Sequence, residues 1–422
     1  MEPSIGFFFF FSLIFIQENV SHGGDYLELV VQRGHTFWLY SQLFQIPLQL
    51  IVDSNKEADP MNLKIGETIK IPGFISSAYT IQPGDTFWSI SSKRNIPLQQ
   101  LLFINSGIEP THLRAGTTIK LPIRITWRLI DGKKNYDYET LVRDIRMLLT
   151  VYPFIQQGSI GNSVMQKQIP EMIVGTGPKK VHVNGSFHAN EWITTSILMT
   201  FLNDYLLALT NQTCIRNVPS LSLYEKTFLS IVPMVNPDGV NLVLYGPPDE
   251  EPYKSNVLKL NNGSKEFSGW KANIRGIDLN NQFPARWSIE KERKPKEPGP
   301  RDYPGQKPLS EPESIAIANL TKRRNFDRVL AFHSQGKEIY WGFEGFEPPI
   351  AETIVSEFAR ASGYKPVRYL DSYAGYKDWF IQEWKRSGFT IEVGMGVNPL
   401  PLLQFDEIYY DNLGILLASL YM

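Results

Sequence analysis

Two segments of the chain carry the same order of hydrophobic and polar positions, 50 residues apart. VQRGHTFW, which starts at Val31, matches IQPGDTFW, which starts at Ile81, and IGETIKIP at Ile65 matches AGTTIKLP at Ala115. In each copy an alternating segment is followed by two short helical segments and a second alternating segment. Because the register holds without insertion or deletion, the pattern indicates two copies of one small α+β domain.

Each copy contains a signal for a helix start. Thr36 and Thr86 follow a glycine turn and precede a helical segment, where a threonine side chain can cap the helix N-terminus. The next residues are large and apolar in both copies. We therefore expect Trp38 and Trp88, like the isoleucines of the repeats, to pack in the core of each domain.

The region from Asn135 to the C-terminus alternates helical and strand-like segments. ITTSILMTFLNDYLLAL is typical of a buried helix, and FLSIVPMVNP and RVLAFHS are apolar throughout, as in a strand covered on both faces. SEPE, Ser310 to Glu313, fits a capping box at a helix start. The polar, proline-rich stretch KERKPKEPGPRDYPGQKP interrupts this order. The alternation predicts an α/β domain whose sheet is covered by helices.

Composition narrows the classes of function. With 42 basic and 43 acidic side chains, the net charge of -1 gives no electrostatic reason to expect nucleic acid or anionic lipid as a partner. The single cysteine, Cys214, excludes an internal disulfide and a cysteine-based zinc site. A metal site in this chain would therefore use histidine and carboxylate ligands.

The N-terminus is apolar. IGFFFFFSLIFI, Ile5 to Ile16, has about the length of a signal-peptide core and is too short to cross a bilayer, which takes about 20 residues. No basic residue precedes it, and no small-x-small cleavage site follows it. We interpret residues 1–26 as an N-terminal extension or an atypical signal, and expect no membrane span.

Two of the six histidines are candidates for chemistry. His188 and His333 each lie at the carboxyl end of an apolar strand, where open α/β sheets place their sites, and Glu191 follows His188 by three residues. Two histidines and one glutamate form a common ligand set of catalytic zinc. We expect the histidine at position 182 to be structural, because it alternates within a strand. The remaining histidines lie in the N-terminal extension and the repeats: His22, His35 and His112.

Two carboxylates belong with this set. Asp278, in GIDLNNQFP, could accept the other ring N–H of His188 and so fix its tautomer. Glu392, in FTIEVG, stands alone among apolar strand residues, where an unpaired carboxylate is costly unless it has a function. A buried salt bridge is the alternative interpretation of Glu392.

The two repeats, residues 27–73 and 77–124, resemble lysin motif (LysM) domains. The pattern G-[HD]-T, the central asparagines Asn55 and Asn105, and the closing G-x-T-I-K-[IL]-P carry the resemblance. It implies binding of glycans that contain N-acetylglucosamine, such as peptidoglycan and chitin.

Residues 135–422 resemble the zinc carboxypeptidase family, with VNPDG, GIDLN and SEPE as further landmarks in the family's order. The resemblance implies a mixed sheet and one Zn²⁺ per chain. It implies that Glu392 is the general acid/base and that a cation stabilises the oxyanion. Arg275 is the candidate cation, with a surface salt bridge as its alternative. The implied zinc ligands are His188, Glu191 and His333, with Asp278 behind the first of them.

One departure from the family bears on the substrate. Carboxypeptidases read D-x-N-R-N, where Asn and Arg bind the substrate's terminal carboxylate. Here Asn280 is kept and Asn281 stands in place of the arginine, so the bidentate clamp is absent. Aligned on the family's D-W pair, Lys377 falls at the specificity position, where it could pair with a carboxylate of diaminopimelate. Tyr373 is the candidate residue that covers the substrate.

Glycan-binding repeats joined to this variant peptidase domain resemble bacterial enzymes that cut the γ-D-glutamyl-diamino acid bond of peptidoglycan stem peptides. The alternatives are a metallocarboxypeptidase that removes C-terminal residues, a non-catalytic wall-binding protein, and a deacetylase or amidase that uses the same zinc. We expect a wall-associated or secreted protein, or one that acts inside a sporulating bacterial cell.

Overall fold

The computed structural model describes residues 26–422, so the interpretation of residues 1–26 as an extension or signal lies outside the described part except for its last residue. Contacts divide the chain into two compact units. The first contains the residues up to Leu129 with Arg143–Ile155 and Asn203–Ile215. The second contains Ile130–Val142, Gln156–Leu202 and Arg216–Met422.

The two repeats share one antiparallel sheet of three strands, in the order β1-β2-β3. The first half of β2 pairs with β1 and its second half pairs with β3, so this strand closes one repeat and opens the next. Two short helices lie between successive strands, as predicted. The elements are β1 (Tyr26–Val30), α2 (Phe37–Phe44), α3 (Leu48–Ser54), β2 (Thr68–Thr80), α4 (Phe87–Arg94), α5 (Leu98–Ile104) and β3 (Thr118–Arg124).

Local bonds of the repeats recur at the same positions. Thr36 caps α2 by accepting from the N–H of Leu39 at 3.0 Å, and Thr86 caps α4 by accepting from the N–H of Ser89 at 3.0 Å. Asn105 both donates to and accepts from the backbone of residue 120, which fixes the last helix to the closing strand. The predicted helix caps are confirmed.

The prediction that Trp38 and Trp88 pack in the cores of the repeats is wrong. Their side chains are 64% and 69% exposed, whereas Phe37 and Phe87 beside them are buried. Adjacent residues on a helix point about 100° apart, so only one of each pair can face the core. Most isoleucines of the repeats do pack inside, as Ile81 and Ile90 show, but Ile65 is 72% exposed.

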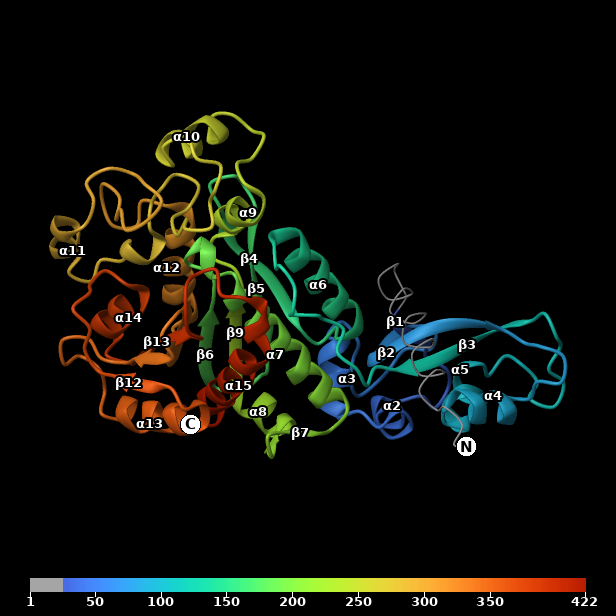
Figure 1. Ribbon diagram of the computed structural model, residues 1–422. Coiled ribbons are helices and arrows are strands. Elements are labelled where there is room, and N and C mark those ends of the chain that lie inside the picture. Colours follow the sequence, from blue (N-terminus) through green and yellow to red (C-terminus); the bar gives the residue numbers. More distant parts are fainter. Residues whose placement is uncertain (1–25) are drawn as a thin grey trace, which may run out of the picture. The chain divides into compact units, whose positions relative to one another are not determined.

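The second unit is built on an eight-stranded mixed sheet in the order β12-β11-β13-β10-β6-β9-β5-β4 (Figure 1). The central strands β13, β10, β6 and β9 run parallel, and antiparallel pairs flank them on each side. The strands are β4 (Gln156–Asn162), β5 (Gln168–Val174), β6 (Lys179–Asn184), β9 (Thr227–Val232), β10 (Arg328–Ser334), β11 (Glu338–Tyr340), β12 (Lys365–Val367) and β13 (Ser387–Val393), with a separate pair β7 (Cys214–Ile215) and β8 (Val218–Pro219).

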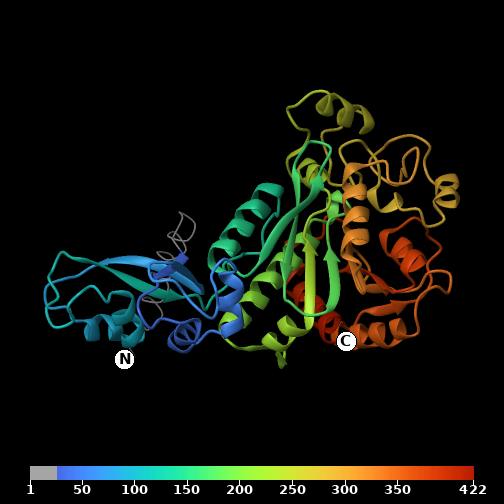
Figure 2. The same ribbon diagram turned by 180° about the vertical axis from the view of Figure 1, so that it is seen from behind.

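Helices cover both faces of this sheet. The helix α15 lies in front of the sheet in Figure 1, and α12 lies in front of it in the view from behind in Figure 2. The predicted mixed sheet covered by helices is confirmed. The helices are α6 (Tyr138–Val151), α7 (Ile193–Thr210), α8 (Ser220–Lys226), α9 (Pro237–Tyr245), α10 (Tyr253–Leu260), α11 (Trp287–Arg293), α12 (Pro312–Arg324), α13 (Ile350–Ser362), α14 (Tyr376–Trp384) and α15 (Phe405–Tyr421), with short 3₁₀ turns η1 (Ala189–Glu191), η2 (Leu279–Asn281) and η3 (Leu402–Gln404).

The predicted capping box at α12 is wrong. The N-cap is Glu311, without a side-chain cap bond, and the helix starts at Pro312, so Ser310 stands one residue before the cap position that the motif requires. The Ser310 hydroxyl lies beside Gln282 Oε1 at 3.1 Å, and Glu313 accepts from the N–H of Val164 at 3.0 Å. Ser310 and Glu313 therefore bond to residues distant in the sequence instead of capping the helix.

One stretch of the described chain, Ala189–Thr210, is long and apolar enough to cross a membrane by length and composition. Within its most apolar window of 18 residues, 89% of the residues are buried inside the protein, as in the core helix of a folded domain. This stretch contains α7, which the sequence predicts as a buried helix.

Candidate active site

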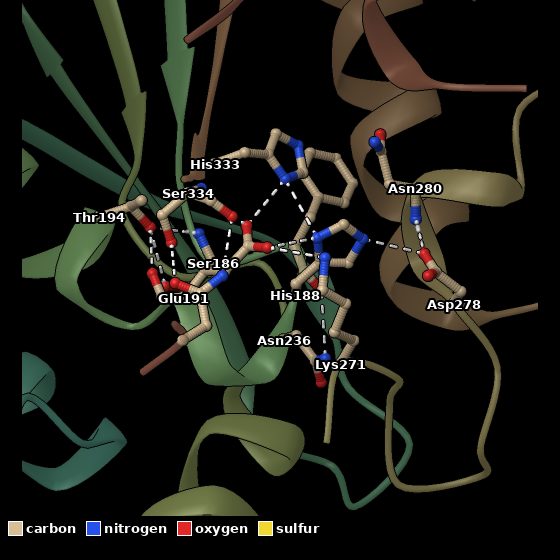
Figure 3. Close-up of polar contacts among 12 residues, drawn as sticks. Ser186, His188, Glu191, Thr194, Asn236, Lys271, Asp278, Asn280, His333 and Ser334 are labelled. Atoms are coloured by element: carbon tan, nitrogen blue, oxygen red, sulfur yellow. Dashed lines mark hydrogen bonds and ion pairs between the residues drawn. The ribbon is translucent and has the colours of Figure 1, made fainter. Parts of the chain in front are cut away.

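Three side chains converge at the carboxyl edge of the sheet. His188 Nδ1 lies 2.9 Å from Glu191 Oε1, and His333 Nδ1 lies 3.0 Å from Glu191 Oε2 (Figure 3). The two Nδ1 atoms are 3.2 Å apart. The structure thus brings together the three residues that the sequence selects as candidate metal ligands.

This donor set fits a zinc ion. Ligand atoms at 2.0–2.1 Å from zinc with tetrahedral angles lie about 3.3 Å from one another, close to the spacing of these donors. Two imidazole nitrogens and one carboxylate also leave a fourth position open, as catalytic zinc sites do. The site's residues are therefore compatible with a zinc centre in both chemistry and spacing.

A tight turn after β6 positions the first two donors. Gly185 follows the strand, and a Cβ at this residue would lie 2.9 Å from Thr194 Oγ1 and 3.1 Å from Pro233 O. Thr194 Oγ1 accepts from the N–H of Ser186 at 2.8 Å and donates to the carbonyl of Glu191 at 2.8 Å. These bonds fold the chain back over one turn and direct both side chains to the same point.

Asp278 holds the His188 ring from the other side. Its Oδ1 lies 3.1 Å from His188 Nε2 and accepts from the N–H of Asn280 at 3.0 Å. Burial alone would raise the pKa of Asp278, but the His188 ring and the Lys271 ammonium outweigh it and hold the pKa below its usual range. An ionised Asp278 keeps the proton on Nε2, which leaves the lone pair of Nδ1 free to bind a cation.

Glu392 lies beside the site on the neighbouring strand. Its backbone is in register with that of His333 in the parallel pair β10–β13. Burial and the Glu191 carboxylate raise the pKa of Glu392 to about 8, against the opposing charge of Lys271. Within residues 26–422 no cation forms an ion pair with Glu392, so the salt-bridge interpretation has no partner. A carboxyl group that titrates near neutral pH suits a general acid/base.

The cation at the site is Lys271 rather than Arg275. Lys271 Nζ lies 3.2 Å from Glu191 Oε1, beside His188 (Figure 3). The Arg275 side chain is 51% exposed and pairs with Glu311 at 3.4 Å, so the structure does not bring it to the site. The alternative interpretation of Arg275 as a surface salt bridge is the one observed. Sequence reasoning missed Lys271, although it stands in the same run, WKAN.

The candidate substrate-binding residues have defined positions around the site. Asn280 Oδ1 accepts from the N–H of Tyr376 at 3.2 Å and so ties η2 to the start of α14. Asn281 is buried, and its N–H donates to the carbonyl of Asp278 at 3.1 Å. Lys377 is also buried, in contrast to a surface lysine. Its ammonium donates to Gly342 O at 2.9 Å and pairs with Asp378.

Tyr373 lines a cavity of about 350 Å³ near this region. Aromatic and glycine residues form most of its wall, and Gly342, the partner of Lys377, is one of them. Through Gly342 the cavity wall contacts Lys377, the residue that the alignment places at the specificity position. Its other lining residues are Phe343, Glu344, Gly345, Tyr369 and Leu370.

Comparisons with known proteins agree with this arrangement. A family model described as zinc carboxypeptidase matches residues 141–401, and a LysM domain model matches residues 29–72 and 79–122. The chain is 61% identical over 396 residues to "Gamma-D-glutamyl-L-diamino acid endopeptidase 1" of Lysinibacillus sphaericus, covering 94% of this chain and 100% of that protein. It is 46% identical over 296 residues to the uncharacterized protein YqgT of Bacillus subtilis (strain 168), covering 69% and 79%.

Solved structures share the fold of the second unit. The crystal structure of thrombin activatable fibrinolysis inhibitor matches with a TM-score of 0.55 at 17% identity, covering 68% of this chain and 74% of that chain. Carboxypeptidase A from Helicoverpa armigera matches with a TM-score of 0.53 at 16% identity, covering 69% and 74%.

Proposed function

Because the chain belongs to the zinc carboxypeptidase family, we propose that it hydrolyses the γ-D-glutamyl-diamino acid amide bond of peptidoglycan stem peptides. The observation that carries this proposal is the 61% identity to an endopeptidase named for that bond, over the full length of that protein. Both repeats fall within the aligned length, so the likeness includes the glycan-binding part as well as the peptidase domain.

We propose that one zinc ion is held by His188, Glu191 and His333. When bound, it supplies Lewis acidity to the scissile carbonyl and lowers the pKa of a bound water. Asp278 keeps the His188 ring in the tautomer and orientation that the metal requires, through the 3.1 Å contact to Nε2.

Glu392 carries the proton in this proposal. Its carboxylate accepts a proton from the attacking water and passes the proton to the nitrogen of the leaving diamino acid. A pKa raised to about 8 makes it a stronger base than an ordinary glutamate and keeps the proton available for the second step. The ammonium of Lys271 is the donor for the oxyanion that develops on the carbonyl.

The substrate preference rests on Asn281 and the cavity next to Lys377. An arginine at position 281 would bind a free C-terminal carboxylate in a bidentate manner, and asparagine cannot replace it in that role. A stem peptide that continues beyond the diamino acid needs no such clamp. We propose that the cavity lined by Tyr373 receives the diamino acid side chain, with Lys377 favouring diaminopimelate through its carboxylate.

We propose that the LysM repeats hold the enzyme on the wall by binding its glycan. Two linked sites raise the apparent affinity through effective concentration, without new contacts. Cell-wall association, outside the cell or within a sporulating one, follows from this proposal.

Digestion of purified muropeptides followed by mass spectrometry of the products tests the function. We expect cleavage between D-Glu and diaminopimelate in L-Ala-γ-D-Glu-diaminopimelate stems, and little release of C-terminal residues from α-linked peptides. Efficient C-terminal trimming would favour the exopeptidase alternative, and loss of acetyl groups alone would favour the deacetylase. An enzyme that binds these stems without cleaving any bond would favour the non-catalytic alternative.

A further inference from the structure

Residues 300–305, named the strap, run beside the loop that carries Lys271 and Asp278. The N–H groups of Lys271 and Ala272 both donate to Pro300 O, at 2.8 and 3.0 Å. The N–H of Asp278 donates to Tyr303 O at 2.8 Å. The strap belongs to the proline-rich stretch that interrupts the alternation of helices and strands, and neither family resemblance gives this stretch a role.

The loop at residues 270–278 contains no strand or helix, and the N–H groups of Lys271, Ala272 and Asp278 take their partners from outside the loop. Proline carbonyls suit this purpose, because a proline accepts hydrogen bonds but donates none. Proline also restricts the unfolded chain, which lowers the entropy lost when the strap is ordered. The strap therefore replaces a neighbouring strand at a place where the sheet provides none.

The strap also contacts the Asp278 carboxylate. The N–H of Asp302 lies 3.3 Å from Asp278 Oδ2, while Asp278 Oδ1 faces His188 at 3.1 Å. Asp302 holds a φ of 67°, in the left-handed region that non-glycine residues keep only where their surroundings fix them. One oxygen of Asp278 thus contacts the strap, and the other contacts His188 at the site, as Figure 3 shows for His188.

Gln282 anchors the far end of the strap. Its side chain is fully buried, its Nε2 donates to Pro304 O, and its Oε1 accepts from the N–H groups of Ser310 and Glu311 at 2.7 and 3.2 Å. Gly305 closes the turn with a φ of 84°, and a Cβ there would lie 2.6 Å from Gln282 Nε2. A single amide thus joins the strap to the start of α12.

We propose that the strap is a positioning element that sets the orientation of the Asp278 carboxylate and of the Lys271 ammonium, with Gln282 as its anchor. This inference rests on the proposed zinc site and adds residues to its support. Lys271 and Asp278 both lie beside His188 (Figure 3), so a displaced strap changes the charge around His188 and the direction of its ring. Gln282 and the strap residues touch neither the metal nor the substrate in this proposal.

Gly305→Ala is the test variant and Gly299→Ala its control, although Gly305→Ala also adds backbone strain at a φ of 84°, which the Tm registers. A methyl group at Gly305 collides with the anchor, whereas a methyl group at Gly299 meets nothing within 4 Å. For Gly305→Ala we expect a zinc dissociation constant raised about tenfold or more, as for other changes behind metal ligands, and a fall in kcat larger than the rise in KM. Gly299→Ala should stay within about twofold of the wild type in all three quantities.

Chelator competition gives the zinc dissociation constant, kinetics on a soluble muropeptide give kcat and KM, and thermal unfolding gives Tm. A strap with a merely structural role would lower the Tm of Gly305→Ala but leave the zinc affinity of the folded protein unchanged. That result would overturn the inference.

If Gly305→Ala does not fold, Gln282→Asn provides the same test, because it keeps the amide and shortens its reach by one methylene. Weaker zinc binding by this folded variant supports the inference, and wild-type zinc binding contradicts it. Failure of the wild type itself to bind zinc would instead contradict the proposed zinc site, so the two proposals fail in different ways.

Discussion

Two histidine networks lie in the same sheet, and they differ in whether every ring nitrogen has a hydrogen-bond partner. In the central network, His182 bonds to Ser230 Oγ at 3.0 Å and to Asn184 Nδ2 at 3.1 Å. Ser230 donates to Glu171 at 2.7 Å, and Arg324 pairs with the same carboxylate at 2.9 Å. Burial lowers the pKa of His182 to about 3, so its ring is neutral, and both ring nitrogens have partners.

In the edge network, hydrogen bonds between neutral side chains cannot pair all polar atoms of His188, Glu191 and His333. Two Nδ1 atoms and two carboxylate oxygens face one another, and His333 Nε2 has no hydrogen-bond partner among the described residues. Positive charge already gathers here, since Lys271 lies 3.2 Å from Glu191, and Glu191 and Asp278 outweigh burial and raise the pKa of His188 to about 9. A metal ion would take the place of the proton on His188 Nδ1. All three histidines are buried, so burial does not distinguish a structural histidine from a metal ligand. The hydrogen-bond partners of the ring nitrogens do.

The largest difference between the two networks is expected when one histidine is removed from each. We expect His333→Ala to lose most of its zinc and, with it, nearly all hydrolysis, since a ligand atom is removed. His182→Ala should keep its zinc but lose about 1–3 kcal/mol of stability, because Ser230 and Asn184 lose their partner. Metal analysis and denaturant unfolding of both purified variants measure this. Full zinc retention by His333→Ala would show that the ligand set is wrong.

The next largest effect concerns two glutamates whose pKa values are both raised to about 8, Glu392 and Glu313. Glu392→Gln should keep zinc and fold but lose about 10²- to 10⁴-fold in kcat, because both proton transfers depend on this carboxyl. Glu313→Gln is the matched control, with activity close to that of the wild type. Equal activities of the two variants on a muropeptide would remove Glu392 from the mechanism.

Much of the edge network could be predicted from the sequence, because its residues lie at strand ends. The apolar runs before His188, His333 and Glu392 predict buried parallel strands. The carboxyl ends of such strands meet at one edge of the sheet, so these three residues come together there. The repeats were predictable for a different reason. Their caps and asparagine bonds are local and occur twice.

Lys271 could not be predicted, because it lies in a loop whose course is set by Pro300 and Tyr303 of the strap, far along the chain. Backbone hydrogen bonds between two loops leave no periodic pattern of hydrophobic residues in the sequence. Arg275 was therefore favoured only because it lies close to Asp278 in the sequence. The exposed Trp38 and Trp88 were missed because a pair of adjacent aromatics does not show which member faces the core. A long-range contact thus decides the position of Lys271, and the face that each helix turns to the core decides that of the tryptophans.

A smaller effect is expected at the specificity pocket. Lys377→Met keeps most of the side-chain volume but removes the charge that pairs with Asp378 and lies next to the cavity wall. We expect kcat/KM to fall about tenfold more on diaminopimelate stems than on lysine stems, since tenfold corresponds to about 1.4 kcal/mol, less than the cost of about 3–5 kcal/mol for removal of one partner from a buried ion pair. The ratio of the two substrates cancels any loss of folded enzyme. Equal losses on both stems would remove Lys377 from the pocket.

The smallest expected effect is on stability and returns to Glu313, a buried carboxyl away from the edge network. Burial raises its pKa from the usual 4.5 to about 8, and the N–H of Val164 only partly opposes this. Between these two pH values the unfolded chain binds fewer protons at this residue than the folded chain does. The free energy of unfolding therefore falls as the pH rises through this window and then levels off above it.

Glu313→Gln mimics the protonated carboxyl and removes this slope. We expect its Tm to match that of the wild type near pH 4 and to exceed it by several degrees near pH 9, because each kcal/mol shifts Tm by about 2–4 °C in a domain of this size. Comparison at each pH cancels the titration of Glu392 and of the histidines, which both proteins share. Thermal unfolding measured from pH 4 to 9 decides the matter. A constant Tm difference across that range would mean that the pKa of Glu313 is the same in the folded and the unfolded protein, and it would contradict the raised pKa.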